Sequence, residues 1–250
     1  MRISTQARDA GFLAISVLVF GGLWQLVGLL KVSPAIPPLT DVLIAMVDVA
    51  QDRRFQEAAA NTGVSVIMTF VPVVVIGVLV GVAMGSSKWF EWIGAPYVNM
   101  SLAIPLVSLI PVFLLIFGLG RPTIIAVIVA YALPAVIVNT QAGIESVDAD
   151  QRAMARSVGA GRLLTFRRIT LPSSAALIMS GVRVAAGRAI KGSIIAEQII
   201  GLVGLGGLIQ RFGGAFAVEN LYAVILYIGI VGILVVWLLG LAERRLGGAR

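Results

Sequence analysis

Residues 148–172 read DADQRAMARSVGAGRLLTFRRITLP, and the rest of the chain is arranged around this charged stretch. It carries five arginines and two aspartates and lies between two apolar runs that are each long enough to cross a bilayer. Asp148 can cap a helix, and Gly159 can end that helix in the left-handed conformation. The stretch therefore predicts a short helix over residues 149–158 and a second one over residues 162–169.

The composition excludes an ordinary soluble globule. Of the 250 residues 59% are hydrophobic and 12% are charged, and the mean hydropathy is +1.01; soluble domains carry about twice that charged fraction. The net charge of +7 comes mainly from residues between apolar runs, which indicates membrane topology rather than a nucleic-acid partner. The chain has no Cys and no His, so disulfides, thiol or imidazole catalysis and His metal sites are excluded.

The apolar segments predict an all-α polytopic membrane protein, with one transmembrane domain over residues 1–250. Six transmembrane helices are expected, at residues 11–30, 65–85, 97–119, 123–140, 173–200 and 221–241. Gly77, Gly81 and Gly85 predict close helix packing in the second span. Pro105 and Pro111 make the third span either a pore-lining helix or one with a packing kink, and a further proline, Pro134, breaks the fourth.

Two connecting segments have a character of their own. Residues 41–50 resume helical spacing after a proline-rich turn and predict a surface or interfacial helix. Residues 201–216 hold six glycines and predict a mobile connection, either a plain link or part of an external gate or docking surface.

The distribution of basic residues predicts which side of the membrane each loop occupies. Eleven lysines and arginines lie on the side of both termini, including Arg2, Arg8, Arg250 and the five of residues 148–172, whereas five lie on the other side. Because cytoplasmic loops are enriched in Lys and Arg, the termini and the charged stretch are expected in the cytoplasm.

The two short helices of residues 148–172 predict a contact surface. Met154 and Val158 share one helix face, and Arg152 and Arg156 share another. The second helix places Leu163, Phe166 and Ile169 on one side, and Pro172 falls in the first turn of the next span. An exposed apolar stripe framed by arginines suits a groove in another protein, whereas a solvated basic loop that only enforces topology is the simpler alternative.

The same stretch resembles the cytoplasmic signature of ABC importer permeases. Gly159 is followed after nine residues by Ile169 and then by Leu171-Pro172, and Ala153-Met154-Ala155 stands where the family has Glu-Ala-Ala, so the glutamate is missing here. Further matches resemble the nitrate/sulfonate/taurine branch of these permeases: Trp24-Gln25-Leu26, Pro37-Pro38-Leu39-Thr40, Phe117-Gly118-Leu119-Gly120, Asn139-Thr140 with Gly143, and Gly187-Arg188-Ala189 with Ala196-Glu197.

The resemblance implies the type I ABC importer permease fold with cytoplasmic coupling helices. It implies a multi-pass protein of the bacterial inner membrane, surrounded by lipid, paired with a second permease copy, docked on two cytoplasmic ATPase subunits and supplied by an external substrate-binding protein. No GxxxxGK[ST] motif occurs, so ATP and Mg are expected on the partner ATPase and no cofactor on this chain. The ATPase-coupling residues implied are Met154, Ala155, Arg156, Ser157, Val158, Gly159, Leu163, Phe166, Ile169, Leu171 and Pro172.

Charged residues in the fifth span suggest a path for the substrate. Arg188 and Lys191 lie three residues apart, and a shared cationic face would attract a small anion such as nitrate or a sulfonate. Pairing of these charges with carboxylates or helix carbonyls is the competing interpretation. Other candidates for the path are Ser101, Pro105, Ser108, Asn139, Arg183 and Glu197.

Three alternatives stay open at the level of the sequence. An ion-coupled secondary transporter would need paired repeats and discontinuous helices, for which no half-to-half match is found. A membrane-bound enzyme lacks His, Cys and a close carboxylate pair within the spans. The same permease role with a neutral or cationic substrate also stays open, so the sequence does not name the substrate.

Overall fold

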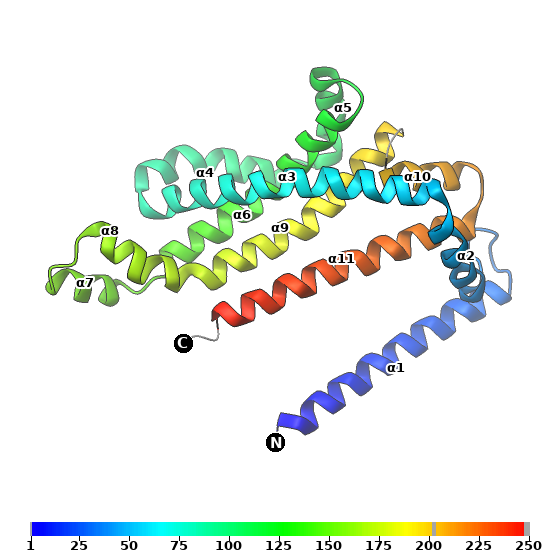
Figure 1. Ribbon diagram of the computed structural model, residues 1–250, viewed down its shortest axis with the longest axis horizontal. Coiled ribbons are helices and arrows are strands. Elements are labelled where there is room, and N and C mark those ends of the chain that lie inside the picture. Colours follow the sequence, from blue (N-terminus) through cyan, green and yellow to red (C-terminus); the bar gives the residue numbers. More distant parts are fainter. Residues whose placement is uncertain (1, 202–203, 248–250) are drawn as a thin grey trace.

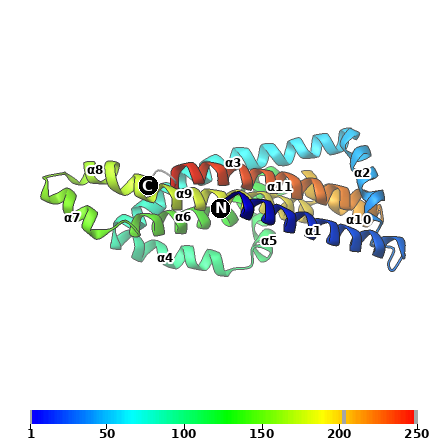
Figure 2. The same cartoon turned by 90° about the horizontal axis from the view of Figure 1, so that it is seen from below.

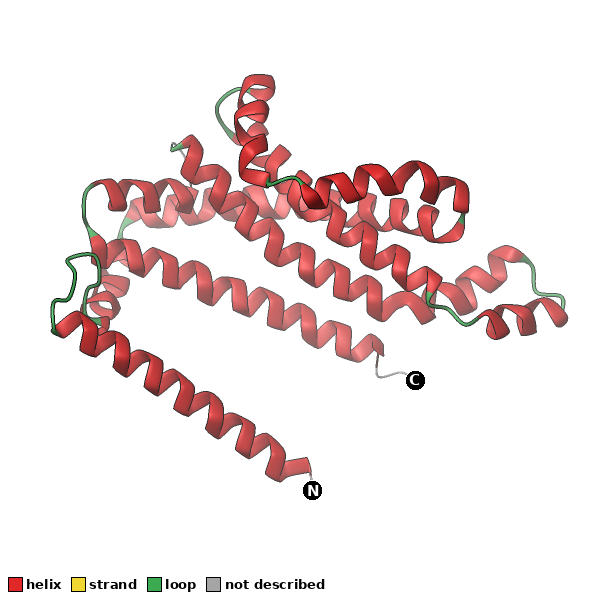
Figure 3. Cartoon of the chain, turned by 180° about the vertical axis from the view of Figure 1, so that it is seen from behind, coloured by secondary structure: helices red, strands yellow, loops and turns green. Residues whose placement is uncertain are grey.

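The computed structural model describes residues 2–201 and 204–247, and within them the chain is helical without any strand (Figures 1 and 3). The predicted all-α class is therefore confirmed. The elements in chain order are α1 (Arg2–Leu29), α2 (Leu39–Gln51), α3 (Arg53–Ser86), α4 (Lys88–Ala103), α5 (Leu106–Phe117), α6 (Arg121–Glu145), α7 (Ala149–Ser157), α8 (Arg162–Thr165), the π-helical turn η1 (Phe166–Thr170), α9 (Leu171–Ile200), α10 (Gly204–Gly214) and α11 (Val218–Gly247).

The core is formed by α3, α6 and α9, which lie side by side along the long axis of the molecule (Figures 1 and 2). Small residues let these backbones approach closely. A Cβ added at Gly81 would lie 2.5 Å from Cβ of Thr140, and one added at Gly77 would lie 2.6 Å from Cβ of Val136. The predicted packing role of the glycines in the second span is confirmed, and their partner is α6.

Of the remaining long helices, α11 packs on this core and α1 is attached to α2. α11 packs against α9 and α2, and the Tyr227 hydroxyl donates a hydrogen bond to the Met46 carbonyl at 2.8 Å. α1 is attached to α2 mainly through its last turns, where Trp24 Nε1 donates to the Pro37 carbonyl at 3.1 Å and the Thr40 amide donates to Gln25 Oε1 at 3.0 Å. On the amino-terminal side of these contacts, α1 leans away from the bundle (Figure 1), and its described apolar side chains are exposed.

The third predicted span is wrong as a single helix. It is divided into α4 and α5, which meet at an angle of 105° across Ile104 and Pro105. A residue that precedes proline is disfavoured in the α conformation, and Ile104 has the extended angles φ −72° and ψ 127°. By contrast α6 continues through Pro134 without a break, so the predicted interruption there is also wrong.

By length and composition, four helices of the described residues can cross a membrane, and the bent pair of α4 and α5 makes up to five. α1 is not one of these helices. Its apolar part within the described residues, Ala14–Leu29, is a shorter apolar helix. The expected number of six transmembrane helices is therefore approximate. The helical part of the second span begins earlier than predicted, because Asp52 caps α3 by accepting a hydrogen bond from the Arg54 amide at 2.8 Å.

The glycine-rich connection is also more ordered than the sequence suggests. Residues 204–214 form α10, which packs against α9, α3 and α11, whereas residues 202–203 lie outside the described residues. The amino-terminal end of α1 and the carboxyl-terminal end of α11 both point toward the side that carries α7 and α8 (Figure 1). The side chains of Arg2 and Arg8 and the whole of Arg250 lie outside the described residues.

Candidate functional site

The charged stretch forms a projection at one end of the bundle, as Figures 1 and 2 show. α7 starts where the Asp150 amide donates to Asp148 Oδ1 at 2.9 Å, which confirms the predicted cap. It ends at Ser157, Gly159 beyond it has a left-handed φ of +80°, and the Ala160 amide donates a hydrogen bond to the Ala155 carbonyl at 2.9 Å. Local hydrogen bonds thus define α7 as the separate helix that the sequence predicts.

The second short helix is not separate, which corrects the prediction. α8, the π-helical turn η1 and α9 form one continuous helix, Arg162–Ile200, of 39 residues. Pro172 would clash with the carbonyl four residues earlier in a regular α-helix. In the turn just before it, the Leu171 amide bonds to the Phe166 carbonyl, five residues back, and this wider register accommodates the proline.

The projection exposes apolar side chains. Met154 is 63% exposed, Val158 78% and Leu163 68%, although α7 contacts α8 and η1. Ala155 is buried, so its methyl group faces the chain itself rather than a partner. The remaining predicted coupling residues divide into half-buried Phe166 and Ile169 and exposed Ser157, Gly159, Leu171 and Pro172.

The polar side of α7 is only partly described. The side chain of Arg156 lies outside the described residues, as does that of Arg152, so the predicted arginine face is not described. Ala153, which stands in place of the family glutamate, is exposed on α7. The surface at this position is therefore a methyl group where the family would present a carboxylate.

The charges of α9 point in different directions. Arg188 lies over the ring of Tyr131 on α6, with its guanidinium carbon 5.6 Å from the ring centroid. Lys191 is exposed and lines a groove of about 570 Å³ between α9 and α11, together with Arg183 and Arg244. Arg188 and Lys191 therefore have different surroundings, the Tyr131 ring and the groove beside α11, although they lie only three residues apart on α9.

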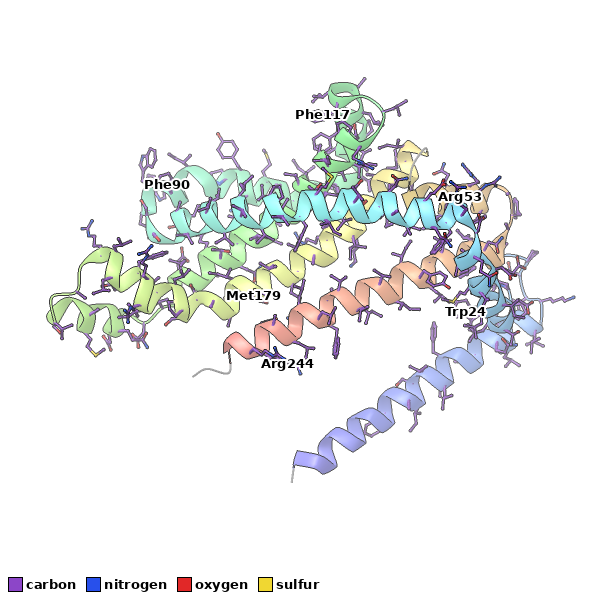
Figure 4. The ribbon with its side chains drawn as sticks, viewed as in Figure 1. Trp24, Arg53, Phe90, Phe117, Met179 and Arg244 are labelled. Atoms are coloured by element: carbon purple, nitrogen blue, oxygen red, sulfur yellow. The ribbon has the colours of Figure 1, made fainter. Side chains whose placement is uncertain are left out.

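Arg183 is paired with a carboxylate, as expected if the charges of the fifth span are neutralised rather than exposed to a substrate path. Its Nε lies 2.9 Å from Oε2 of Glu243 on α11, and the two side chains are 38% and 23% exposed. Sequence reasoning missed Glu243, because the two residues are sixty positions apart and no local pattern joins them. Arg244 follows Glu243 on the last turns of α11 (Figure 4), and it lines a pocket together with Arg183 and Glu243.

Glu197 is enclosed rather than open to a path in this conformation. Its side chain is 1% exposed. Oε2 accepts hydrogen bonds from the Thr62 hydroxyl at 2.9 Å and the Gly206 amide at 3.0 Å, and Oε1 accepts one from the Ser193 hydroxyl at 2.9 Å. The Thr62 oxygen in turn accepts from the Leu205 amide at 2.9 Å, so this carboxylate joins α3, α9 and the start of α10.

The polar path candidates of the third and fourth spans lie apart from one another. Ser101 donates to the Val98 carbonyl at 2.7 Å, and Asn139 donates through Nδ2 to the Ala135 carbonyl at 2.8 Å. Pro105 lies in the break between α4 and α5, and Ser108 is exposed in the first turn of α5. Among the described residues, no hydrogen bond joins any two of these side chains.

Comparisons with known proteins agree with this architecture. Residues 73–248 match the family model described as the binding-protein-dependent transport system inner membrane component. The taurine transport system permease protein TauC of Escherichia coli (strain K12) is 28% identical over 242 residues, which cover 94% of this chain and 87% of the relative. The nitrate import permease protein NrtB of Synechocystis sp. is 28% identical over 160 residues, which cover 64% of this chain and 58% of the relative.

A solved structure shows the same fold. An inward-facing form of the MetNI methionine ABC transporter matches with a TM-score of 0.62 and 21% sequence identity, over 82% of this chain and 96% of the other. The helical architecture of this chain thus belongs to the type I importer permease fold. The chain belongs to the family of inner membrane components of binding-protein-dependent transport systems, the permease subunits of ABC importers.

Proposed function

We propose that this permease works as a homodimer on two ATPase subunits and carries a small anion into the cytoplasm. The projection formed by α7 and α8 carries the proposal for coupling, because it holds exposed Met154, Val158 and Leu163 outside the bundle. Apolar side chains in such a position bury surface when they enter a groove on another protein. Closure of the ATPase pair would then move α7 and, through the continuous helix Arg162–Ile200, the spans themselves.

The proposed orientation places both termini and α7 in the cytoplasm. It rests on the excess of basic residues on that side of the sequence and on the common direction of the free ends of α1 and α11. An external substrate-binding protein would then approach the opposite end, where α2 and α10 lie (Figure 1).

The anionic substrate is supported by the cations of the fifth span and by the names of two relatives, which carry taurine and nitrate. Lys191 has no ion pair among the described residues, and Arg188 is held over an aromatic ring. A neutral or cationic substrate is the competing candidate. The family membership leaves no support for an ion-coupled secondary transporter.

Uptake by proteoliposomes that contain the permease, its ATPase partner and its binding protein tests the proposal. ATP-dependent accumulation of nitrate or taurine is expected, and Lys191→Gln should slow it, whereas Lys31→Gln in an external loop serves as the matched control. Accumulation of a neutral compound alone, or a Lys191→Gln rate equal to the control, would contradict the anionic assignment. A chain that copurifies with no ATPase subunit would contradict the coupling assignment.

A further inference from the structure

A pocket lined by two arginines lies at the end of the molecule opposite α7. It has a volume of about 180 Å³, opens to the surface and lies between the first turns of α3 and α10, with Arg54, Asn61 and Arg211 in its wall. Figure 4 shows the neighbouring Arg53 at the start of α3, close to α10. The charged stretch and the groove between α9 and α11 are separate features, so the function described above does not use this pocket.

The charges around the pocket leave two arginines available to a ligand. Glu57 also lines it, but its Oε1 accepts from Arg53 Nε at 2.9 Å, so that carboxylate is already neutralised. Asn61 accepts from Arg121 Nη2 through Oδ1 at 3.2 Å, which adds a further cation at the rim. Among the described residues, the guanidinium groups of Arg54 and Arg211 make no ion pair or hydrogen bond.

Membrane topology does not account for these arginines. In the orientation proposed above they face the external side, where the positive-inside rule disfavours Lys and Arg. An unpaired guanidinium is a planar donor that matches the geometry of oxyanions such as carboxylate and phosphate, often through two hydrogen bonds. Their presence on this side is therefore consistent with a ligand rather than with topology.

The size and the rigidity of the pocket restrict the ligand. Its volume lies below the roughly 300 to 1,000 Å³ of sites for drug-sized molecules. The wall formed by α10 is fixed in place, because the Leu205 and Gly206 amides are held by Thr62 and Glu197. A preformed wall suits a small ligand with few atoms rather than a large heterocycle.

We propose that Arg54 and Arg211 form an external capture site for a small oxyanion, a nitrate or a sulfonate, at the point where it leaves the binding protein. This inference rests on the proposed function, because it requires an anionic substrate and an external position for α10. It goes beyond that function by assigning the first contact of the substrate to α3 and α10, not to α9.

The absence of cysteine from the chain permits a charge-rescue experiment. Arg54→Cys and Arg211→Cys are each reconstituted with the partner ATPase and a saturating concentration of binding protein loaded with nitrate or taurine. Uptake per ATP hydrolysed should fall about tenfold or more, since each variant removes a charge-assisted hydrogen bond to the anion. A methanethiosulfonate reagent that adds a trimethylammonium group should restore uptake, and one that adds a sulfonate should not.

Lys31→Cys is the matched control, because Lys31 is an exposed cation of an external loop in the proposed orientation and does not line the pocket. It should keep its uptake per ATP with either reagent. Rescue by the positive reagent also shows that the Arg54 and Arg211 variants are folded, since a collapsed protein would not regain transport.

Three results would overturn the inference. Uptake per ATP that equals the control in both cysteine variants excludes a role for these charges. Equal recovery with the negative reagent shows that side-chain volume, not charge, is required. A shift only in the binding-protein concentration needed for half-maximal uptake assigns the arginines to docking of an acidic protein surface. If the unmodified protein accumulates no oxyanion at all, the proposed function fails together with this inference, and the two failures are thereby distinguished.

Discussion

Replacing Glu197 by alanine should release the start of α10 from α3 and α9. The carboxylate is almost completely buried and accepts three hydrogen bonds, from Thr62, Ser193 and the Gly206 amide. The two amides at the beginning of α10 have no partner within their own helix, so they depend on these side chains. Loss of the carboxylate therefore removes a support for the helix as well as a set of contacts.

The magnitude follows from these contacts. A hydrogen bond to a charged group contributes about 1.5 to 3 kcal/mol, but removal of a buried charge also relieves its desolvation, so the three contributions do not add. We expect Glu197→Ala to lower the free energy of unfolding by about 3 kcal/mol, which corresponds to about 6 to 12 °C in Tm for a chain of this size. Glu197→Gln keeps one acceptor for the Gly206 amide and should cost about 1 kcal/mol.

Thermal unfolding of the purified full chain in detergent, followed by circular dichroism, measures the stability. Hydrogen exchange at the Leu205 and Gly206 amides reports on α10 itself, and both amides should exchange faster in Glu197→Ala. Glu57→Ala is the control, because this carboxylate is 62% exposed and its pair with Arg53 should contribute less than about 1 kcal/mol. A Glu197→Ala protein that matches the control in Tm and in amide exchange would refute the reasoning.

Three further changes test other parts of the structure. Gly81→Val should lower the free energy of unfolding by about 1 to 3 kcal/mol, because its Cβ meets α6, whereas Gly63→Ala has open space and should be neutral in the same unfolding assay. Val158→Glu should weaken copurification of the ATPase about tenfold while the protein stays inserted, because an apolar contact is replaced by a charge; unchanged copurification would contradict docking at α7. Arg183→Gln and Glu243→Gln should show a coupling energy of about 0.5 to 1 kcal/mol in a double-mutant cycle of unfolding, and strictly additive effects would show that the ion pair is not formed.

Features set by local chemistry could be predicted from the sequence. Asp148 and Gly159 mark the two ends of α7, because a cap and a left-handed turn depend only on nearby residues. The glycines at positions 77 and 81 were rightly assigned to helix packing, although their partner on α6 was not predicted. The all-α class and the sequence signature that resembles the family could also be recognised from the sequence alone, because both depend on residues close together along the chain.

Other predictions failed because the same residue type, proline or glycine, gives different backbone structures in different tertiary surroundings. Proline at 105 bends the chain by 105°, whereas proline at 134 is accommodated inside a helix that neighbours support on both sides. Residues 204–214 are rich in glycine and still form a helix, since Thr62 and Glu197 hold its first amides from other elements. The residues next to these prolines and glycines along the chain do not reveal which structure forms.

The sequence by itself determined that this is a helical membrane protein with a short, capped helix between two apolar spans, because hydropathy, capping and turn formation act over a few residues. Only the tertiary structure decided which charges are paired and which are free: Arg183 with Glu243, Glu197 buried beneath α10, and Arg54 and Arg211 unpaired beside a pocket. Ion pairs and pockets arise where helices distant in sequence meet, and the direction of each side chain there is set by packing rather than by its neighbours along the chain.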